Sequence, residues 1–379
     1  MNVTIAIDSL KGSLSSMEAG FAIEKGIRKV YPDASVQVRP LADGGEGTVD
    51  ALVAGMNGTL REVTVTGPLG EPVTAKYGII ESTGTAVMEM SQAAGITLIS
   101  SEQRNPLYTT TYGVGEMILD AIKHGCRRFI MGIGGSATND GGIGMLQALG
   151  YDFLDDSGKQ IARGAIGIAD LTRISSEHVI SELKECSFRI ACDVTNPLCG
   201  EKGCSAVYGP QKGATPEMIQ DMDVWLGNYA KIATESFASA DAKYPGTGAA
   251  GGLGFAFLTF TNATLESGIK IVLEETKLRE YVSDADFVIT GEGRLDEQTA
   301  MGKAPIGVAK LAKEFGIPVL AFSGCVTKDA VACNDHGIDA FFPILRTVVS
   351  LDEAMDSDAA AQNMTDTVEQ VFRVIQTVK

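Results

Sequence analysis

The sequence predicts an α/β protein with two α/β domains, and three observations support this fold class. Short apolar runs alternate with amphipathic stretches toward both ends of the chain, as in a parallel sheet with helical crossovers. A length of 379 residues exceeds what one hydrophobic core usually supports. After about residue 60, alternating apolar residues flank turn signals, which indicates an antiparallel hairpin and hence a mixed sheet in the second domain.

The first elements of the chain are predicted to be strand, helix, strand and helix. The apolar run "VTIAI" ends just before Asp8, as a buried parallel strand would. The stretch "SSMEAGFAIEKGIRKVYP" has helical spacing, with Ser15 and Glu18 as a capping box and Pro32 closing it. The run "SVQVRPL" predicts the next strand, which leads to Asp43, and "GTVDALVAGM" predicts the next helix.

The middle and the end of the chain follow different patterns. The segment "REVTVTGPLGEPVTAKYGII" predicts the hairpin, with its turn at Gly67 and Pro68. Further predicted strands lie in "RRFIMGIGG" and "FRIACDV". The last hundred residues return to strand and helix in alternation, with strands in "DADFVITGEG", "IPVLAFSG" and "IDAFFPI" and a helix in "KAPIGVAKLAKEFG".

These patterns predict a domain organisation in which one domain is discontinuous. Residues 1–62 and 283–379 are expected to form the parallel α/β domain, and residues 63–282 an inserted α/β domain with a mixed sheet, with a cleft between the two. The chain has no low-complexity linker and no internal repeat. Two sequential domains remain the alternative.

Composition narrows the class of function. A net charge of −17 disfavours nucleic acid and anionic membranes as partners. No apolar run reaches the length of a membrane span, the start "MNVTIAIDSL" lacks signal-peptide features, and the seven cysteines form no Cys-x-x-Cys pair. We therefore expect a cytoplasmic protein with reduced thiols. Because the chain has only three histidines, proton transfer is expected to fall to carboxylates or lysines.

Loops rich in glycine or acidic residues follow several predicted strands. In open parallel sheets, ligands bind at the carboxyl ends of strands, so these loops are the expected site. They contain carboxylates that can hold Mg²⁺, cations that can hold phosphates, and glycine amides that can surround oxygen atoms. This combination favours phosphoryl transfer. The loops are "IDSLKGS", "LADGGEGT", "GIGGSATNDGG", "ACDVTNPL" and "ITGEGRLDEQT".

Two other classes of function remain open from the residues alone. The segment "GIGGSA", residues 132–137, satisfies the dinucleotide pattern G-x-G-x-x-A, which would indicate an NAD(P)-dependent oxidoreductase. The polar "TNDGG" that follows argues against a Rossmann helix at this point. A non-enzymatic protein that closes two lobes on a small ligand is the other alternative. The chain contains no Walker A sequence.

Motifs along nearly the whole chain resemble the bacterial type-1 glycerate kinases (glycerate 2-kinases). The resemblance weakens only after about residue 345, and it differs from the family pattern Pro-Asp-Ser-Phe-Lys at Ile7 and Leu10, which spares the polar residues. The motifs that carry it are "IAIDSLKGSLS", "LADGGEGTVDAL", "RNPLYTTTYGVGEMI", "IGIGGSATNDGGIGMLQALG", "IACDVTNPLCG", "YGPQKGAT", "GAAGGLGF" and "VITGEGRLDEQTAMGKAP".

The resemblance implies ATP-dependent phosphorylation of D-glycerate, commonly at the 2-hydroxyl, which gives 2-phosphoglycerate and ADP. It also implies that one domain is flavodoxin-like and that the other resembles a restriction-enzyme core. The partners are then small molecules, D-glycerate and Mg·ATP, acting on a monomer or a homodimer. Residue types alone do not distinguish the 2-hydroxyl from the 3-hydroxyl.

Candidate site residues lie in the motif loops. Both substrates are anions, so cations in these loops must overcome the acidic net charge; the cations are Lys11, Arg104, Lys212, Arg294 and Lys303. Lys11 and Lys303 are the expected catalytic cations, and Arg104 can clamp the glycerate carboxylate. The expected substrate-binding residues are Asp8, Ser9, Asp43, Gly44, Gly45, Arg104 and Asn105. The expected nucleotide-binding residues are Gly134, Gly135, Ser136, Thr138, Gly291, Glu292 and Gly293.

Carboxylates are the expected magnesium ligands and the expected acceptor of the hydroxyl proton. Mg²⁺ is expected at Asp43, Asp193 and Glu292, although a tight turn is the alternative role of the Asp43 loop. Asp193 follows the apolar run of "RIACDVTNPLCG" and precedes the rigid Asn196–Pro197, so it is the expected catalytic base. Asp43 and Asp8 are the other candidates. A structural alternative is an Asx turn in which Asp193 accepts from the amide of Thr195.

Overall fold

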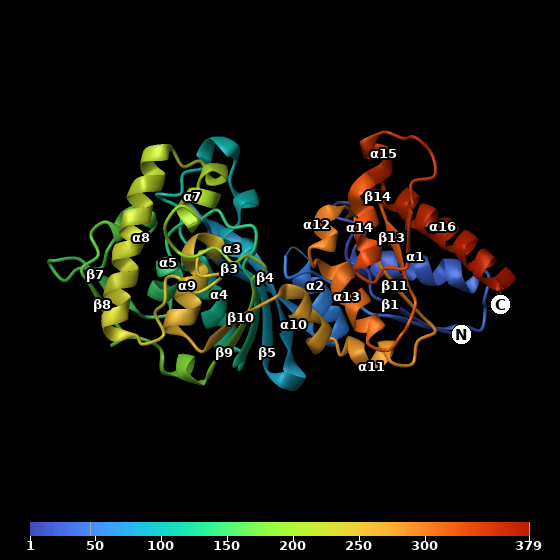
Figure 1. Ribbon diagram of the computed structural model, residues 1–379. Helices are drawn as coiled ribbons and strands as arrows, with labels where there is room; N and C mark the ends of the chain where they lie inside the picture. Colours follow the sequence, from blue (N-terminus) through green and yellow to red (C-terminus); the bar gives the residue numbers. More distant parts are fainter. Residues whose placement is uncertain (46, 379) are drawn as a thin grey trace. The chain divides into compact units, whose positions relative to one another are not determined.

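The computed structural model describes residues 1–45 and 47–378, which divide into two compact units (Figure 1). Unit 1 comprises residues 1–43, 50–56 and 269–379, and unit 2 comprises residues 44–49 and 57–268. The two units contain a parallel five-stranded sheet and a mixed six-stranded sheet respectively, which confirms the predicted fold class. The predicted domain boundaries at 62/63 and 282/283 stay a prediction; in the structure, residues 269–282 group with unit 1.

Unit 1 is built on a parallel sheet of flavodoxin-like order. Its strand order is β15-β13-β11-β1-β2, and every neighbouring pair is parallel. Numbered along the chain, this is the order 2-1-3-4-5, in which the direction of winding reverses between β1 and β11. Ligands of such sheets bind at the carboxyl ends of strands beside this reversal. The strands are β1 (Asn2–Ile5), β2 (Ser35–Val38), β11 (Phe287–Thr290), β13 (Val319–Ser323) and β15 (Ala340–Pro343), and a two-stranded sheet is formed by β12 (Arg294–Leu295) and β14 (Cys325–Val326).

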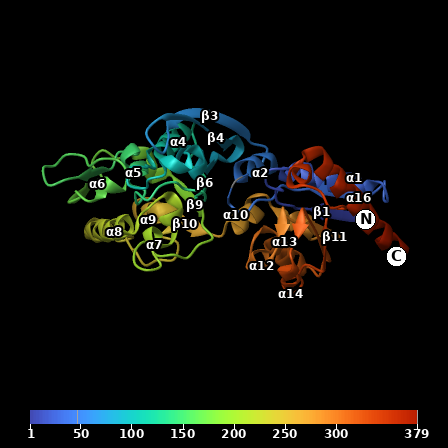
Figure 2. The same ribbon diagram turned by 90° about the horizontal axis from the view of Figure 1, so that it is seen from above.

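Helices α1 (Ser16–Arg28) and α16 (Ser357–Val378) lie side by side in unit 1 (Figure 2). The predicted capping box of α1 is present, with the Ser15 side chain accepting from Glu18 N. The apolar side of α16 repeats every four residues, at Ala360, Met364, Val368 and Phe372, and packs into the same core as β1. The other helices of unit 1 are α11 (Leu278–Val282), α12 (Glu297–Ala300), α13 (Ala304–Lys313), η6 (Lys328–Val331), α14 (Ala332–Asp335) and α15 (Leu351–Met355). Helices α2 (Thr48–Gly55) and α10 (Gly268–Glu275) each contain a point where the chain passes from one unit to the other, at 49/50 and 268/269.

Unit 2 is built on a mixed sheet of order β10-β9-β6-β5-β4-β3. The predicted hairpin is confirmed, since β3 and β4 pair antiparallel from Thr59↔Ile79 to Thr66↔Pro72. Strand β4 also pairs antiparallel with β5, and the remaining neighbours are parallel. The strands are β3 (Thr59–Thr66), β4 (Pro72–Ile80), β5 (Thr85–Glu89), β6 (Arg128–Gly132), β9 (Ser187–Ala191) and β10 (Ala263–Glu266), with β7 (Asp152–Leu154) and β8 (Arg173–Ser175) in a separate hairpin.

An aromatic core holds the helices of unit 2 against this sheet. Phe129 of β6 and Phe188 of β9 stack with ring centroids 4.7 Å apart, and Phe257 packs on Phe188. The helices are α3 (Ser91–Ala94), α4 (Tyr112–Lys123), α5 (Ile143–Ala148), α6 (Ala165–Ile168), α7 (Cys204–Tyr208), α8 (Pro216–Ser236) and α9 (Ala249–Phe260), with 3-10 turns η1 (Glu81–Thr83), η2 (Ile96–Leu98), η3 (Ser101–Gln103), η4 (Ser181–Glu185) and η5 (Pro210–Lys212). Among the described residues, no helix is both long and apolar enough to span a membrane.

Candidate active site

A cavity of about 380 Å³ opens at the carboxyl ends of the parallel strands of unit 1. Loops that follow β1, β11, β13 and β15 all contribute to its lining, so the cavity lies where a sheet of this order binds ligands. Its polar lining comes from Ser9, Lys11, Ser13, Asp43, Glu292, Arg294, Asp296, Lys303 and Asn363. Its other lining residues are Leu10, Gly293, Gly324, Cys325, Ile344, Leu345, Leu351, Ala354, Met355 and Ala360.

The loop after β1 holds a buried carboxylate next to this cavity. The backbone N–H of Asp8 donates to Gly291 O at 2.9 Å, which continues the pairing of β1 with β11 beyond the strand ends. The side chain is only 3% exposed, and its Oδ1 accepts from Ser9 N at 2.7 Å. Burial, reinforced by the negative charge of Asp43, raises the pKa of Asp8 to about 7. A buried carboxyl with such a pKa is typical of a functional site.

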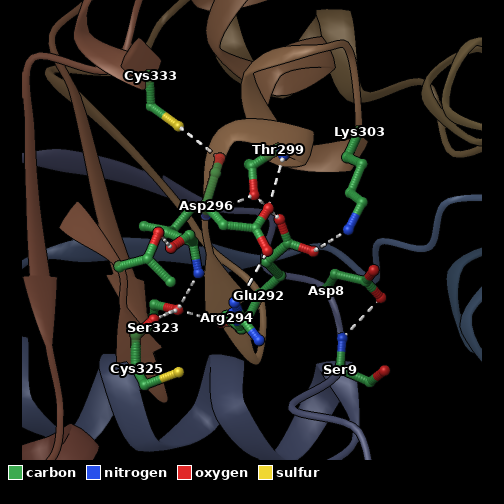
Figure 3. A network of polar contacts seen from close by, with 12 residues as sticks. Asp8, Ser9, Glu292, Arg294, Asp296, Thr299, Lys303, Ser323, Cys325 and Cys333 are labelled. Carbon is green, nitrogen blue, oxygen red and sulfur yellow. Dashed lines mark hydrogen bonds and ion pairs between the residues drawn. The ribbon is translucent and has the colours of Figure 1, made fainter. Parts of the chain in front are cut away.

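The loop after β11 requires glycine at its first position. Gly291 has φ +151°, and a Cβ there would collide with the carbonyl oxygen of Phe322 on β13. Ser323, at the end of β13, fixes the loop from the other side. Its hydroxyl lies 2.7 Å from Glu292 O and 2.9 Å from Cys325 O, and it accepts from Leu295 N at 3.1 Å (Figure 3).

Glu292 is the central carboxylate of the network in Figure 3. Its Oε1 accepts from Thr299 Oγ1 at 2.6 Å, and its Oε2 lies 4.0 Å from Lys303 Nζ. Thr299 itself is placed by the helix start of α12, where Asp296 caps the Thr299 N–H. Burial raises the pKa of Glu292, although the bond from Thr299 and the charge of Lys303 oppose this rise.

Three cations line the same cavity. Lys11 is exposed in the loop after β1, and Lys303 occupies the N-cap position of α13. Arg294 keeps 64% of its side chain exposed and lies 3.4 Å from Asp296. A mixture of three cations with the carboxylates of Asp43 and Glu292 can hold a polyanion together with a divalent cation.

Of the residues predicted from the sequence, one group therefore lies together in unit 1. Its members are Asp8, Ser9, Lys11, Asp43, Gly291, Glu292, Gly293, Arg294 and Lys303. Strand β2 ends at Val38, so Asp43 lies in the loop beyond it rather than at the strand end that was predicted. The other predicted residues lie in unit 2.

Gly44 in unit 2 has a packing reason for being glycine. Its φ is +90°, and a Cβ would lie 2.7 Å from Ala191 Cβ and 2.9 Å from Gly268 Cα. The missing side chain lets the loop approach the ends of β9 and β10. Next to it, Gly45 O accepts from Thr48 Oγ1 at 2.7 Å at the start of α2. A contact of these glycines with substrate stays a prediction.

The loop after β6 is organised by a buried lysine. Lys212 was placed among the loop cations from the sequence, but it is only 2% exposed. Its Nζ donates to Ser136 Oγ at 2.8 Å and to Thr138 O at 2.6 Å. Thr138 is fully buried, whereas Gly134 and Gly135 are exposed. Burial lowers the pKa of Lys212 to about 8.

Arg104 and Asn105 lie at a turn in unit 2. Asn105 Oδ1 accepts from Leu107 N at 3.1 Å, which is an Asx turn. Arg104 Nη1 donates to Gln211 O at 3.4 Å, while its buried Nε has no hydrogen-bond partner among the described residues. A role in binding a substrate carboxylate stays a prediction for both.

Asp193 projects from the end of β9 as an exposed residue, as the sequence predicted. Its Oδ1 accepts from Gly268 N at 3.2 Å. The turn that follows is held by Asn196, whose Nδ2 donates to Lys202 O and whose Oδ1 accepts from Tyr208 Oη. The carboxylate thus sits on a supported loop.

The structure does not give residues 132–137 the context of a dinucleotide-binding loop. Such a loop must lead directly into a helix whose N-terminus faces the pyrophosphate. Here the segment does not enter a helix; instead, Ile96 N donates to Gly135 O and Ala137 N donates to Ala94 O. Helix α5 starts only at Ile143, after two glycines with positive φ. The oxidoreductase alternative loses its structural basis.

Several lining residues were missed from the sequence. The main group belongs to residues 344–363, where the family resemblance had weakened. One signal was available: Ser350 and Glu353 form a capping box that predicts the start of α15. Thr299 and Ser323 were also missed, because hydroxyls that hold carboxylates and carbonyls have no sequence pattern of their own.

A flavodoxin-like sheet with cations, carboxylates and glycine loops at its strand ends defines an enzyme acting on small anionic molecules. The chain matches the model of the glycerate kinase family over residues 3–376. It is 48% identical to a glycerate kinase of Bacillus subtilis, with 100% of this chain and 99% of the other covered. It is also 48% identical to a glycerate 2-kinase of Escherichia coli, with 93% of each covered. A crystal structure described as a glycerate kinase 2, from Salmonella typhimurium LT2, superimposes with a TM-score of 0.92 at 45% identity, covering 100% of this chain and 98% of that one. The chain belongs to the glycerate kinase family.

Proposed function

We propose that the protein transfers the γ-phosphoryl group of ATP to the 2-hydroxyl of D-glycerate, giving 2-phosphoglycerate and ADP. The observation that carries this proposal is the cavity of unit 1, where three cations and several carboxylates converge at the strand ends. The Escherichia coli relative named glycerate 2-kinase supports the choice of the 2-hydroxyl.

Cations of unit 1 act on the phosphates. Lys11 and Lys303 are the catalytic cations, because charge on the transferring phosphoryl group must be neutralised as it moves. Arg294 assists them from the same cavity. Backbone N–H groups of the 291–293 loop and of the loop containing Gly134, Gly135, Ser136 and Thr138 are the proposed contacts for phosphate oxygens.

The residues of unit 1 fit a magnesium ion. Asp43 and Glu292 line the cavity, and the burial that raises the pKa of Glu292 makes a positive counter-ion favourable there. Among residues 1–45 and 47–378, no group of three His, Cys, Asp or Glu side chains is arranged to hold a metal alone. Mg²⁺ suits such a site, since it usually takes one or two carboxylates and completes its shell with phosphate oxygens and water. Asp43, Glu292 and Asp193 are the proposed ligands, and bound Mg²⁺ supplies charge neutralisation on the phosphates.

The hydroxyl proton of glycerate needs an acceptor while the oxygen–phosphorus bond forms and the bond to the leaving ADP oxygen breaks. We assign this role to Asp193, whose exposed carboxylate stands on a supported loop. Asp43 and Asp8 are the alternatives; the pKa of Asp8, about 7, lies in the range suited to a base near neutral pH. Asp8, Ser9, Asp43, Gly44, Gly45, Arg104 and Asn105 are the proposed contacts of D-glycerate.

The proposal also covers the cellular compartment and the oligomeric state of the enzyme. A cytoplasmic enzyme is consistent with seven free thiols, and the active form is proposed to be a monomer or a homodimer.

One experiment tests the activity directly. Purified protein is mixed with D-glycerate and Mg·ATP, ADP release is followed, and the product is identified by ³¹P and ¹H NMR. We expect 2-phosphoglycerate, loss of turnover in EDTA and its return with added Mg²⁺ or Mn²⁺. Absence of ADP release would contradict the proposal, and 3-phosphoglycerate as product would contradict the choice of hydroxyl.

A further inference from the structure

The cavity of unit 1 has a polar half and an apolar half. The polar half holds the cations and carboxylates described above. The apolar half is lined by Leu10, Ile344, Leu345, Leu351, Ala354, Met355 and Ala360. Two of these side chains are unusually open for their type, with Leu351 75% exposed and Met355 36% exposed. Large apolar side chains that line a cavity and stay exposed are typical of a ligand surface.

Only one of the two proposed substrates can cover such a wall. D-glycerate is a three-carbon acid with oxygen on every carbon, so it has no apolar face to bury. ATP joins a flat, largely apolar base to a chain of phosphates, and its two ends differ in the same way as the two halves of the cavity. We infer that the wall formed by residues 344–360 together with Leu10 is the adenine subsite of ATP, with the triphosphate directed toward Lys11, Arg294 and Lys303. This inference rests on the proposed function.

Polar groups on the apolar side of the cavity can form hydrogen bonds with the edge of the adenine base. Ser13 and Asn363 both line the cavity. Ser13 Oγ is buried and has no hydrogen-bond partner among the described residues. An Asn side-chain amide can pair with the adjacent donor and acceptor of adenine. Two polar groups in an apolar wall are the usual means by which a small-molecule site fixes the orientation of its ligand.

The turn that carries Ser13 is packed against the same wall. Leu10 N donates to Leu14 O at 2.8 Å, which closes a tight turn around Gly12. A Cβ on Gly12, whose φ is +81°, would lie 2.6 Å from Met355 Cε. The loop after β1 therefore connects the two halves, since it carries Lys11 on one side of Gly12 and Ser13 on the other.

A bulky residue in the apolar half should affect ATP and leave glycerate alone. We expect Ala354→Trp to raise the KM for ATP roughly tenfold or more, because the indole occupies the space of the base, with the KM for D-glycerate nearly unchanged. Ala359→Trp is the matched control: Ala359 is exposed and does not line the cavity, so its KM values should equal those of the parent. An unchanged KM for ATP in a folded Ala354→Trp protein, or a rise for glycerate instead, overturns the inference.

Alkylation of Cys325 tests the same site without any substitution. Cys325 is exposed and lines the cavity, whereas Cys126, Cys186, Cys204 and Cys333 are buried. We expect ATP and adenosine each to slow the labelling of Cys325 by N-ethylmaleimide, read by peptide mass spectrometry, and D-glycerate not to do so. Labelling of Cys199, a partly exposed thiol in unit 2, is the internal control. If adenosine gives no protection, the base does not occupy this wall.

The outcomes separate this inference from the proposed function. A parent protein that phosphorylates glycerate but fails both tests keeps its function and loses the adenine subsite. A parent protein without glycerate kinase activity loses the proposed function, and adenosine protection of Cys325 then decides alone whether the wall binds the base.

Discussion

The loops at the strand ends of unit 1 and of unit 2 contain similar residue types, but these residues differ in burial and in their hydrogen-bond partners. In unit 1, Lys11 and Arg294 are exposed around a cavity, and the carboxylate of Glu292 accepts from Thr299 Oγ1 and lies 4.0 Å from Lys303 Nζ. In unit 2, Asp140 is fully buried and accepts from Thr111 N and Oγ1 as well as from Gly142 N and Gly144 N. Lys212 is buried nearby with its own acceptors.

This difference distinguishes charged groups that stabilise the fold from charged groups that are available to bind a ligand. Buried ionisable groups with several short hydrogen bonds are typical of structural networks, which fix loops in one conformation. Charges that are exposed around a cavity, with few partners, retain the capacity to bind. Residue type and loop position alone do not distinguish the two, and the following predictions test the distinction.

The largest expected effect concerns the base. Asp193→Asn keeps the shape of the side chain and removes its capacity to take a proton, so we expect kcat to fall by roughly 10²- to 10⁴-fold with the KM for glycerate changed little. Asp155→Asn is the matched control, because Asp155 is a partly exposed turn aspartate that also accepts from a backbone amide, that of Ser157. Steady-state kinetics measures both.

A kcat within a few-fold of the parent in Asp193→Asn would remove Asp193 as the base. Asp8→Asn and Asp43→Asn would then be compared in the same assay. A large loss in either would place the base in unit 1 and make the carboxylates of that unit responsible for both metal and proton.

A smaller effect is expected at the phosphate cations. Lys303→Met should lower kcat/KM for ATP by roughly 10- to 100-fold, since a charge-assisted hydrogen bond to phosphate contributes about 1.5–3 kcal/mol. Lys310→Met, on an exposed position of the same helix α13, should leave kcat/KM unchanged. Equal kinetics for the two variants would show that Lys303 does not bind phosphate and that its role is limited to the ion pair with Glu292.

We expect Lys212 to affect the pH dependence of the free energy of unfolding and not the binding of phosphate. Its pKa is about 8 in the folded protein against 10.5 for a free lysine, so between these values the unfolded chain binds the extra proton. The free energy of unfolding attributable to Lys212 therefore rises with pH in this window, by up to about 1.4 kcal/mol per pH unit, and is constant below it.

The measurement compares the parent with Lys212→Met. Buried thiols such as Cys186, whose pKa is raised to about 11, act in the opposite direction, but they are common to both proteins and cancel in the difference. Urea unfolding followed by the fluorescence of Trp225, the only tryptophan of the sequence, which packs against the core of unit 2, gives the free energy at each pH. A difference that does not change from pH 8 to pH 10 would mean that the pKa of Lys212 is not lowered in the folded protein.

The sequence predicted much of the fold because local patterns and neighbour pairing agree there. The strand starting at Asn2, the helix capped by Ser15 and the hairpin after residue 58 all have periodicity and end signals that no distant contact overrides. The family resemblance then supplied the flavodoxin-like class. The sequence could not indicate which polar loop residue is buried: Lys212 has the same appearance in a sequence as Lys11, and its burial depends on distant contacts with Ser136 and Thr138.

The smallest effects come from two capping boxes of the same kind. Ser15 and Glu18 cap α1, which packs into the core of unit 1, whereas Ser350 and Glu353 cap α15, which lines the cavity. Removing such a cap costs about 1 kcal/mol, so Ser15→Ala and Ser350→Ala should lower helix stability to a similar extent. Their consequences should nevertheless differ, because only α15 belongs to the proposed adenine subsite.

In Ser350→Ala the fraction of molecules with an ordered wall falls, and the apparent affinity for ATP falls with that fraction, by about two- to fivefold. In Ser15→Ala the loss should appear in the thermal midpoint, with both KM values unchanged. Kinetics and thermal unfolding of the two variants, together with hydrogen exchange at the amides of α1 and α15, measure the pair. A shift of the KM for ATP in both variants, or in neither, would show that the order of α15 does not govern nucleotide binding.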